Sequence, residues 1–125
     1  MKPSKQSAKI ARLRKKADKL FYQVVMAKNN GICEVCGAMA STAHHFVFKS
    51  QSAELRYDTR NGIPICLKCH FRIHSLGDAE IVNNIIRKRG QKWADELFKV
   101  KNHFVKKYRG VEYYEGIIDI LQKMI

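Results

Sequence analysis

Four cysteines stand in two closely spaced pairs. Cys33 and Cys36 form the first pair, and Cys66 and Cys69 form the second, each with two residues between the cysteines. A C-x-x-C pair places two sulfurs on one tight turn, and two pairs supply the tetrahedral shell of four thiolates that zinc prefers. We therefore predict a structural Zn²⁺ bound by these four residues. A redox dithiol and a disulfide framework are the alternatives.

Four histidines lie between and just after the cysteine pairs, free for a second metal and for chemistry. His70 and His74 are four residues apart, so on a helix they lie on one face and can bind one ion together. His44 and His45 are adjacent, and adjacent side chains of a strand point to opposite faces. One of them can therefore face the ion while the other points elsewhere, unless the strand is bent. A surface pair, or a Cys2His2 zinc site with one cysteine pair, remains the alternative for His70 and His74.

The order of these residues resembles the signature of the HNH endonuclease family. Ala43-His44-His45-Phe46, then Asn61, then residues 69–74 carry the resemblance, which covers roughly residues 31–76. Phage and bacterial members with two C-x-x-C zinc knuckles are the most similar type. The resemblance implies a ββα-metal finger, in which two strands and a helix surround one divalent ion.

The resemblance also implies roles for individual residues. His44, His70 and His74 are expected to bind the catalytic ion, and His45 to be the general base. Asn61 is expected to orient His45 by a hydrogen bond. Three imidazoles make a softer site than the usual carboxylate-rich Mg²⁺ cage, so Mn²⁺, Ni²⁺, Co²⁺ and Zn²⁺ are candidate ions. Mg²⁺ is kept as a further candidate. The alternatives are an ordinary exposed histidine at position 45 and a simple turn with positive φ at Asn61-Gly62.

Charge is concentrated near the start of the chain. The formal net charge is +13, and residues 1–30 hold nine Lys/Arg and one acid, Asp18. Such a segment can act as a phosphate-binding arm, although a solvated basic face is the alternative. The candidate DNA-binding residues are Lys9, Arg12, Arg14, Lys15, Lys16, Lys19, Lys49, Arg56, Arg60 and Arg72.

Hydrophobic periodicity predicts an α+β fold that is mostly helical. Asp78 is expected to cap a helix that ends at Gly90. The predicted elements are a helix over 7–28, a strand over 42–48, a short strand over 62–65, and helices over 67–76, 78–90, 91–108 and after 110. A chain of 125 residues fits one domain, with a basic helical arm (1–30), a zinc-stapled HNH core (31–76) and a helical C-terminal part (77–125).

These patterns together predict a metal-dependent DNA endonuclease or nickase. A non-catalytic zinc-finger DNA-binding protein and a nuclease selective for branched DNA are the alternatives. Duplex or branched DNA is the expected partner, with no small-molecule cofactor, and the chain is expected to be a monomer or a homodimer. No apolar run approaches the ~20 residues that span a membrane, and no signal segment precedes the basic start. We therefore expect an intracellular, cytoplasmic protein of a bacterium or a phage-infected host.

Overall fold

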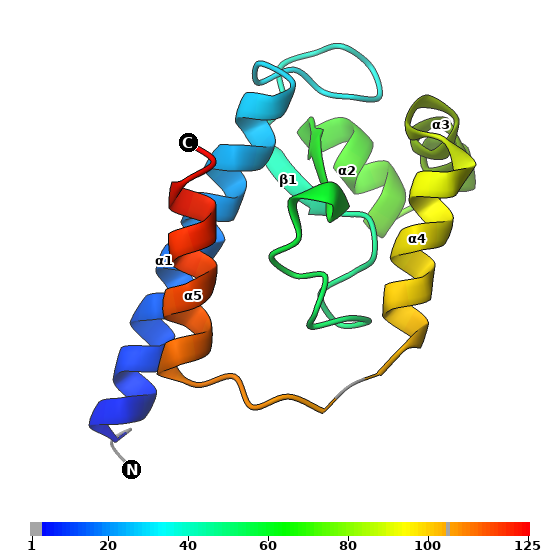
Figure 1. Cartoon of the computed structure of the whole chain (residues 1–125). Coiled ribbons are helices and arrows are strands. Elements are labelled where there is room, and N and C mark those ends of the chain that lie inside the picture. Colours follow the sequence, from blue (N-terminus) through cyan, green and yellow to red (C-terminus); the bar gives the residue numbers. More distant parts are fainter. Residues whose placement is uncertain (1–3, 105) are drawn as a thin grey trace.

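The computed structural model describes residues 4–104 and 106–125 and shows a mostly helical α+β fold with one two-stranded sheet (Figure 1). The elements are α1 (Lys5–Lys28), β1 (Thr42–His45), the short 3-10 helix η1 (Thr59–Asn61), β2 (Gly62–Ile65), α2 (Leu67–His74), α3 (Ala79–Arg89), α4 (Gln91–Asn102) and α5 (Val111–Gln122). The predicted fold class and the order strand, strand, helix around the histidines are confirmed. No helix in the described part of the chain is long and apolar enough to cross a membrane.

Two boundaries differ from the prediction by three residues or more. β1 ends at His45 instead of residue 48, because the amide of Phe46 donates to the carbonyl of Asn61 and the chain then leaves the sheet. α4 ends at Asn102 instead of residue 108. Phe104, which continued the apolar pattern, is 87 % exposed and has no core beneath it. Val105, also part of that predicted helix, lies outside the described residues.

Helix ends follow local sequence signals. The side chain of Asp78 accepts from the amide of Glu80 and begins α3, as predicted. Gly90 ends α3 with a φ of 99°, a backbone conformation that glycine adopts without strain. Asn30 and Gly31 turn the chain out of α1 with φ values of 53° and 71°. The chain therefore enters the first cysteine pair immediately after α1.

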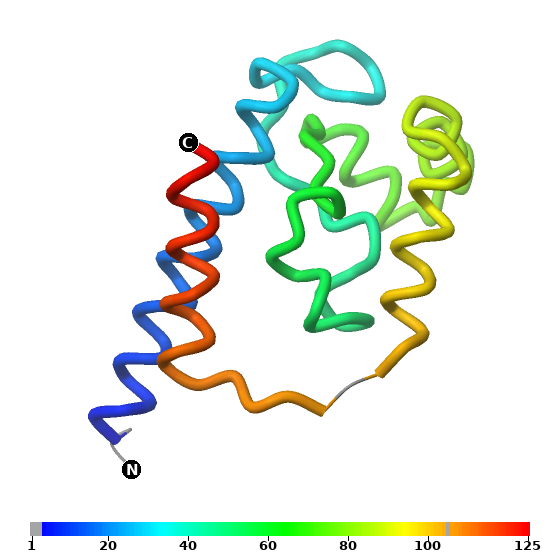
Figure 2. The backbone as a smooth tube through the Cα atoms, viewed as in Figure 1, coloured from blue at the N-terminus to red at the C-terminus, as the bar shows by residue number. Residues whose placement is uncertain are grey.

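The apolar residues form two clusters. One contains the sheet, α2 and the inner faces of α3 and α4, and it includes Cys33, Cys66 and Cys69. The other lies between α1 and α5, which run side by side (Figure 2). Because α1 also packs on the sheet, it contacts both α5 and the two β-strands.

Gly62 is where α1 meets the sheet. The strands are antiparallel, with His45 paired to Gly62 and Thr42 paired to Ile65. A Cβ on Gly62 would lie 2.3 Å from Cγ2 of Val25, so only glycine permits this approach of the helix. The φ of Gly62 is −96°, and Asn61 belongs to η1, so the positive-φ turn considered for Asn61-Gly62 is wrong. The close approach places α1 directly beside His45.

Candidate active site

The four cysteines converge on one point from two segments. Cys33 and Cys36 lie in the loop after α1, Cys66 is the N-cap of α2, and Cys69 is in its first turn. The four sulfurs lie within 4.8 Å of one another, and the Cys36 and Cys66 Sγ atoms are 3.6 Å apart. Sulfurs bound to a tetrahedral zinc at about 2.3 Å would be roughly 3.8 Å apart. A disulfide requires about 2.05 Å, so the donor set fits a metal ion.

The pKa values of the cysteines indicate that the ionised cluster would be stabilised by a bound cation. Burial raises the pKa of Cys69, and the neighbouring sulfurs of Cys66 and Cys36 raise it further. Burial also raises the pKa of Cys33, but backbone donors led by Cys36 outweigh it and lower the pKa to about 7. One thiol therefore ionises readily and another resists ionisation. A bound divalent cation would supply the charge that stabilises four thiolates together.

Arg89 attaches the first cysteine pair to the sheet. Its guanidinium forms two 2.8 Å contacts with the Glu34 carboxylate, inside the first knuckle. The same group donates to the carbonyl oxygens of Gly62 at 3.0 Å and Arg60 at 3.2 Å. The sequence identified Arg89 only as a cation at the end of a helix. Its actual partners are 27 to 55 residues away in the chain, where no local pattern reveals them.

His44, His70 and His74 form a second cluster. Their ring nitrogens lie within 4.8 Å of one another, and the ring centroids are 4.5 to 5.2 Å apart. His44 comes from β1 and is buried, whereas His70 and His74 lie one turn apart on α2. Burial, together with the positive forms of His70 and His74, lowers the pKa of His44 to about 3. The His44 ring is thus held as a neutral imidazole, the form that binds metal ions.

His45 points away from this cluster, toward α1. Its ring stacks on Phe21 with centroids 4.7 Å apart and planes 13° apart, and its Nε2 lies 2.8 Å from the carbonyl oxygen of Arg56. A carbonyl only accepts hydrogen bonds, so Nε2 carries the proton in this contact. A neutral ring then has a free lone pair on Nδ1. Both His45 and the three-histidine cluster border one open hollow of about 500 Å³.

Burial is the main cause that lowers the pKa of His45. The hydrogen bond to the Arg56 carbonyl opposes this by favouring the charged ring, while the positive charges of Lys49 and Arg56 lower the pKa further. The net direction is downward from the ordinary value of about 6.5. The ring is therefore neutral near pH 7 and able to accept a proton.

Asp18 of α1 holds Arg56 in place. Its carboxylate receives three contacts from the guanidinium, at 2.9, 3.1 and 3.3 Å. Asp18 and Phe21 are three residues apart, so they lie on one face of α1. This face therefore supports His45 in two ways, by stacking and by fixing the segment whose carbonyl binds Nε2. The sequence indicated neither contact.

Asn61 is fully buried and binds the loop that follows β1. Its Oδ1 accepts from the amide of Val47 at 2.7 Å, and its Nδ2 donates to the carbonyls of Val47 at 2.9 Å and Leu55 at 3.1 Å. The expected hydrogen bond to the His45 ring is not found among the described residues, where the carbonyl of Arg56 takes that place. The main-chain carbonyl of Asn61 accepts from the amide of Phe46, the residue after His45.

Residues 33–76 match the family model described as HNH endonuclease. This part of the chain is similar to that family, and we call residues 33–76 the HNH segment. The match covers about a third of the chain and includes both cysteine pairs, the three-histidine cluster, His45 and Asn61. It indicates a nuclease, with nucleic acid as the class of substrate, and the two clusters are possible metal sites. Comparison with curated proteins and with solved structures found no match.

The structure divides the predicted DNA-binding residues into two groups. Three arginines around the HNH segment form ion pairs within the chain: Arg56 with Asp18, Arg60 with Asp58 at 2.7 Å and Arg72 with Asp78 at 2.5 Å. The positive charge of each of these arginines is thus already balanced by a carboxylate of the same chain. The six predicted residues on α1 are all exposed, namely Lys9, Arg12, Arg14, Lys15, Lys16 and Lys19. Lys49 borders the hollow beside the histidines.

Proposed function

We propose that this protein is a metal-dependent DNA endonuclease in which each site cuts one strand, with His45 as the general base. The observation that carries this proposal is the 2.8 Å contact between Nε2 of His45 and the carbonyl oxygen of Arg56. The Arg56 carbonyl keeps the proton on Nε2, so the free lone pair of Nδ1 belongs to a neutral ring at the edge of the hollow that also contains the three-histidine cluster. A histidine that served only packing would not need to border this hollow.

In the proposed reaction, Nδ1 of His45 takes a proton from water as the water oxygen attacks the phosphorus. A positioned base contributes on the order of 10²–10⁴-fold to the rate. The Arg56 carbonyl stabilises the charged ring that results, because its hydrogen bond is strengthened when the ring becomes positive. The P–O bond to the 3′ oxygen then breaks.

His44, His70 and His74 would hold a divalent ion beside the base. Such an ion supplies charge neutralisation at the scissile phosphate and at the departing oxygen. The four cysteines would hold the structural zinc, which would fix β2 and α2 against the loop that contains Cys33 and Cys36. The exposed cations of α1 and Lys49 would bind phosphates of DNA on either side of the cut.

The proposal is tested with supercoiled plasmid, using protein treated with a mild chelator and then supplied with each divalent metal in turn. The wild type is expected to produce nicked circles with at least one metal. His45→Ala should reduce the nicking rate by about 10²-fold or more, with zinc content and duplex affinity unchanged. His103→Ala is the matched control, because His103 is exposed at the end of α4, outside the HNH segment.

Two results would contradict the proposal. Nicking by His45→Ala within a few-fold of wild type would show that His45 is not the base. Binding of DNA without cleavage under every metal would favour the non-catalytic zinc-finger alternative. A cruciform substrate in the same assay separates general nicking from selectivity for branched DNA.

A further inference from the structure

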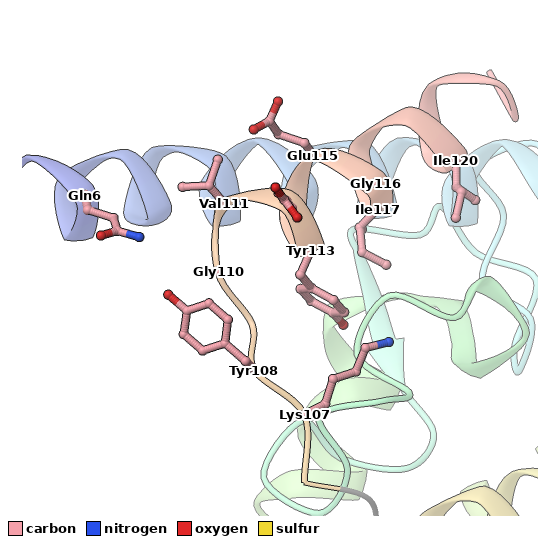
Figure 3. A pocket seen from close by; sticks show the side chains of 11 residues that line it. Gln6, Lys107, Tyr108, Gly110, Val111, Tyr113, Glu115, Gly116, Ile117 and Ile120 are labelled. Atoms are coloured by element: carbon pink, nitrogen blue, oxygen red, sulfur yellow. The ribbon is translucent and has the colours of Figure 1, made fainter.

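The connection between α4 and α5 contributes to two hollows of opposite charge. The larger, of about 910 Å³, lies along α5, and Lys107, Tyr108 and Tyr113 are among the side chains that line it (Figure 3). Its charged lining residues are Lys107, Glu112 and Glu115, so its charge does not favour an anion. The smaller hollow is lined mainly by cations, and one of its walls belongs to the HNH segment.

The smaller hollow, which we call the flank hollow, has a volume of about 240 Å³. One wall is the loop that follows β1, residues 49–54, and the other is the end of α4 with Phe104 and Arg109. Both walls rest on the core around the HNH segment, because Leu55 is buried in it and Val100 packs against it. Pockets that enclose drug-sized ligands measure about 300–1,000 Å³, so the flank hollow suits a smaller group.

The charged side chains of the flank hollow are free to bind an anion. Lys49, Lys101 and Arg109 line it, against one acid, Glu54. None of these four side chains forms an ion pair within residues 4–104 and 106–125. Arg109 can donate several hydrogen bonds, and the described residues provide it with one acceptor, the Lys107 carbonyl at 3.3 Å. Net positive charge and free donors together favour a phosphate group.

Lys49 and Ser50 join the flank hollow to the hollow beside the histidines. Both residues line the two hollows, and Lys49 also lines a third, of about 180 Å³, together with His45. The loop that carries them is held by two of its own amides, which donate to the carbonyl of Phe48 at 2.8 and 3.2 Å. A strand with one phosphate beside His45 can therefore continue past Lys49 into the flank hollow.

Phe104 stands at the edge of the flank hollow with its ring 87 % exposed. Stacking of a base on an aromatic ring strengthens the binding of single strands by about 5- to 150-fold per base. The bases of a duplex are already stacked on one another, so the free face of Phe104 fits an unpaired base. The side chains around it are mainly polar or positively charged, which is typical of an interface with nucleic acid more than with protein.

We propose that the flank hollow binds a phosphate of an unpaired DNA strand next to the cut, and that Phe104 stacks on a base of this strand. This role rests on the proposed function, since it places the unpaired strand beside the proposed cut. The substrate class that follows is DNA whose duplex opens next to the scissile bond, such as a flap, a fork or a tailed end. A fully paired duplex would contact the cations of α1 without engaging Phe104.

The test compares a blunt duplex with a duplex that carries an unpaired tail of about eight nucleotides, a length within the usual range of single-strand sites. The two DNAs have the same number of phosphates. Affinity is measured by fluorescence anisotropy with the full zinc-bound chain and no added divalent metal. Wild type is expected to bind the tailed duplex about tenfold more tightly than the blunt one.

Substitutions of Phe104 separate stacking from a general apolar contact. Phe104→Leu keeps an apolar side chain but has no planar ring, so it should lose most of the preference for the tail. Phe104→Tyr keeps the ring and should keep the preference. Because the side chain is exposed, neither variant should change the melting temperature.

A double substitution tests the phosphate contact. Lys101→Gln with Arg109→Gln should reduce the preference for the tail several-fold. The matched control is Lys99→Gln with Lys106→Gln, which removes the same charge from exposed residues that do not line the flank hollow. The control should keep the wild-type preference.

Three results would overturn the proposal. The first is equal affinity of the wild type for the two DNAs, and the second is a full preference for the tail in Phe104→Leu. The third is competition by polyglutamate as strong as that by a single DNA strand of equal charge, because the flank hollow would then bind any polyanion, acidic protein segments included.

None of these measurements requires cleavage. A protein that prefers the tail but never nicks plasmid would contradict the nuclease proposal alone. A protein that nicks plasmid without preferring the tail would contradict the role of the flank hollow alone.

Discussion

Adjacent histidines of β1 have different environments because successive residues of a strand face opposite ways. His44 faces α2, where burial and two other histidines surround it. His45 faces α1, where Phe21 and one backbone carbonyl determine the ring's position and its tautomer. A single hydrogen bond, from Nε2 to the Arg56 carbonyl, decides which nitrogen is left to accept a proton. We infer that residues supporting this carbonyl matter as much to the reaction as the base itself.

Asn61→Ala is expected to destabilise the protein strongly. The substitution leaves the amide of Val47 and the carbonyls of Val47 and Leu55 without their buried partner. Each unpaired buried group costs about 1–3 kcal/mol, so the free energy of unfolding should fall by about 3 kcal/mol or more. Urea denaturation followed by circular dichroism measures the change.

The control for this prediction is Asn29→Ala. Asn29 also donates a side-chain hydrogen bond to a carbonyl, that of Ile32 at 2.8 Å, but the bond is exposed. Its loss should therefore cost less than about 1 kcal/mol. Equal destabilisation by the two variants would mean that Asn61 has no special structural role.

At the scale of elements, α1 has two functions on two faces. One face carries the apolar residues that pack on α5 and the sheet, together with Asp18 and Phe21 beside His45. The remaining surface carries exposed cations and is proposed to bind phosphates. The sequence predicted the cationic surface, but not that the same helix supports His45.

Asp18→Asn should slow cleavage without weakening DNA binding. Asparagine lacks the charge that holds Arg56, so the Arg56 carbonyl and the His45 ring become less well positioned. Misplacement of a catalytic group by about 1 Å can cost on the order of 10²-fold, and we expect a loss of about tenfold or more in single-turnover rate. The ion pair is partly exposed, so stability should change by less than about 1 kcal/mol.

The variant also raises the net charge by one, so duplex affinity should not fall. Asp18→Glu should recover part of the rate, because it keeps the charge. A rate loss that merely follows a loss of stability, or a fall in affinity of the same size, would count against a positioning role.

Neutralising the exposed face of α1 tests its contact with phosphates. Arg12, Lys15 and Lys19 lie on one side of the helix and are exposed. Changing all three to glutamine should reduce the slope of log K against log salt by about 2.7 on duplex DNA, or about 0.9 for each lost contact. The matched control changes three exposed lysines elsewhere, Lys92, Lys99 and Lys106, to glutamine. Equal slopes of log K against log salt for wild type and the α1 variant would show that these three side chains face solvent and do not contact phosphates.

At the scale of the whole molecule, the two apolar clusters are stabilised in different ways. The α1–α5 cluster is an ordinary helix pair, whereas the cluster around the HNH segment includes three of the four cysteines among its buried residues. Glu34 and Arg89 link the first knuckle to the end of α3 and to the sheet. A metal ion in the cysteine cluster would therefore connect the loop after α1, β2 and α2 at one point.

Cys36→Ser isolates the metal contribution, because Cys36 is the exposed cysteine of the four and its substitution disturbs little packing. A structural zinc contributes about 10–16 kcal/mol of apparent binding free energy near pH 7, comparable with the whole stability of a domain. We expect loss of the bound zinc and of cooperative unfolding in the HNH segment. Metal analysis and thermal denaturation measure these changes. The control is Met39→Ser in the same loop, where the side chain is 82 % exposed; an equally stable Cys36→Ser protein with one zinc would refute the assignment.

The sequence by itself determined the features that depend on residues a few positions apart. Two cysteines on one turn, two histidines on one helical face and Asp78 at the start of α3 all follow from backbone geometry over at most four residues. The opposite directions of His44 and His45 follow from the alternation of a strand. Each of these predictions is confirmed by the structure, because no distant segment is needed to produce them.

Only the tertiary structure decided which groups surround His45. The carbonyl that binds His45 is 11 residues away, and the carboxylate that holds Arg56 is 38 residues away. Both contacts exist because α1 packs against the sheet at Gly62, an approach that depends on the three-dimensional fit of a glycine and Val25. The same packing engages Arg56 in an ion pair and leaves the lysines of α1 in solvent. Residue types and spacing therefore predict candidate ligands and a candidate base, whereas packing between distant segments determines the groups that contact them.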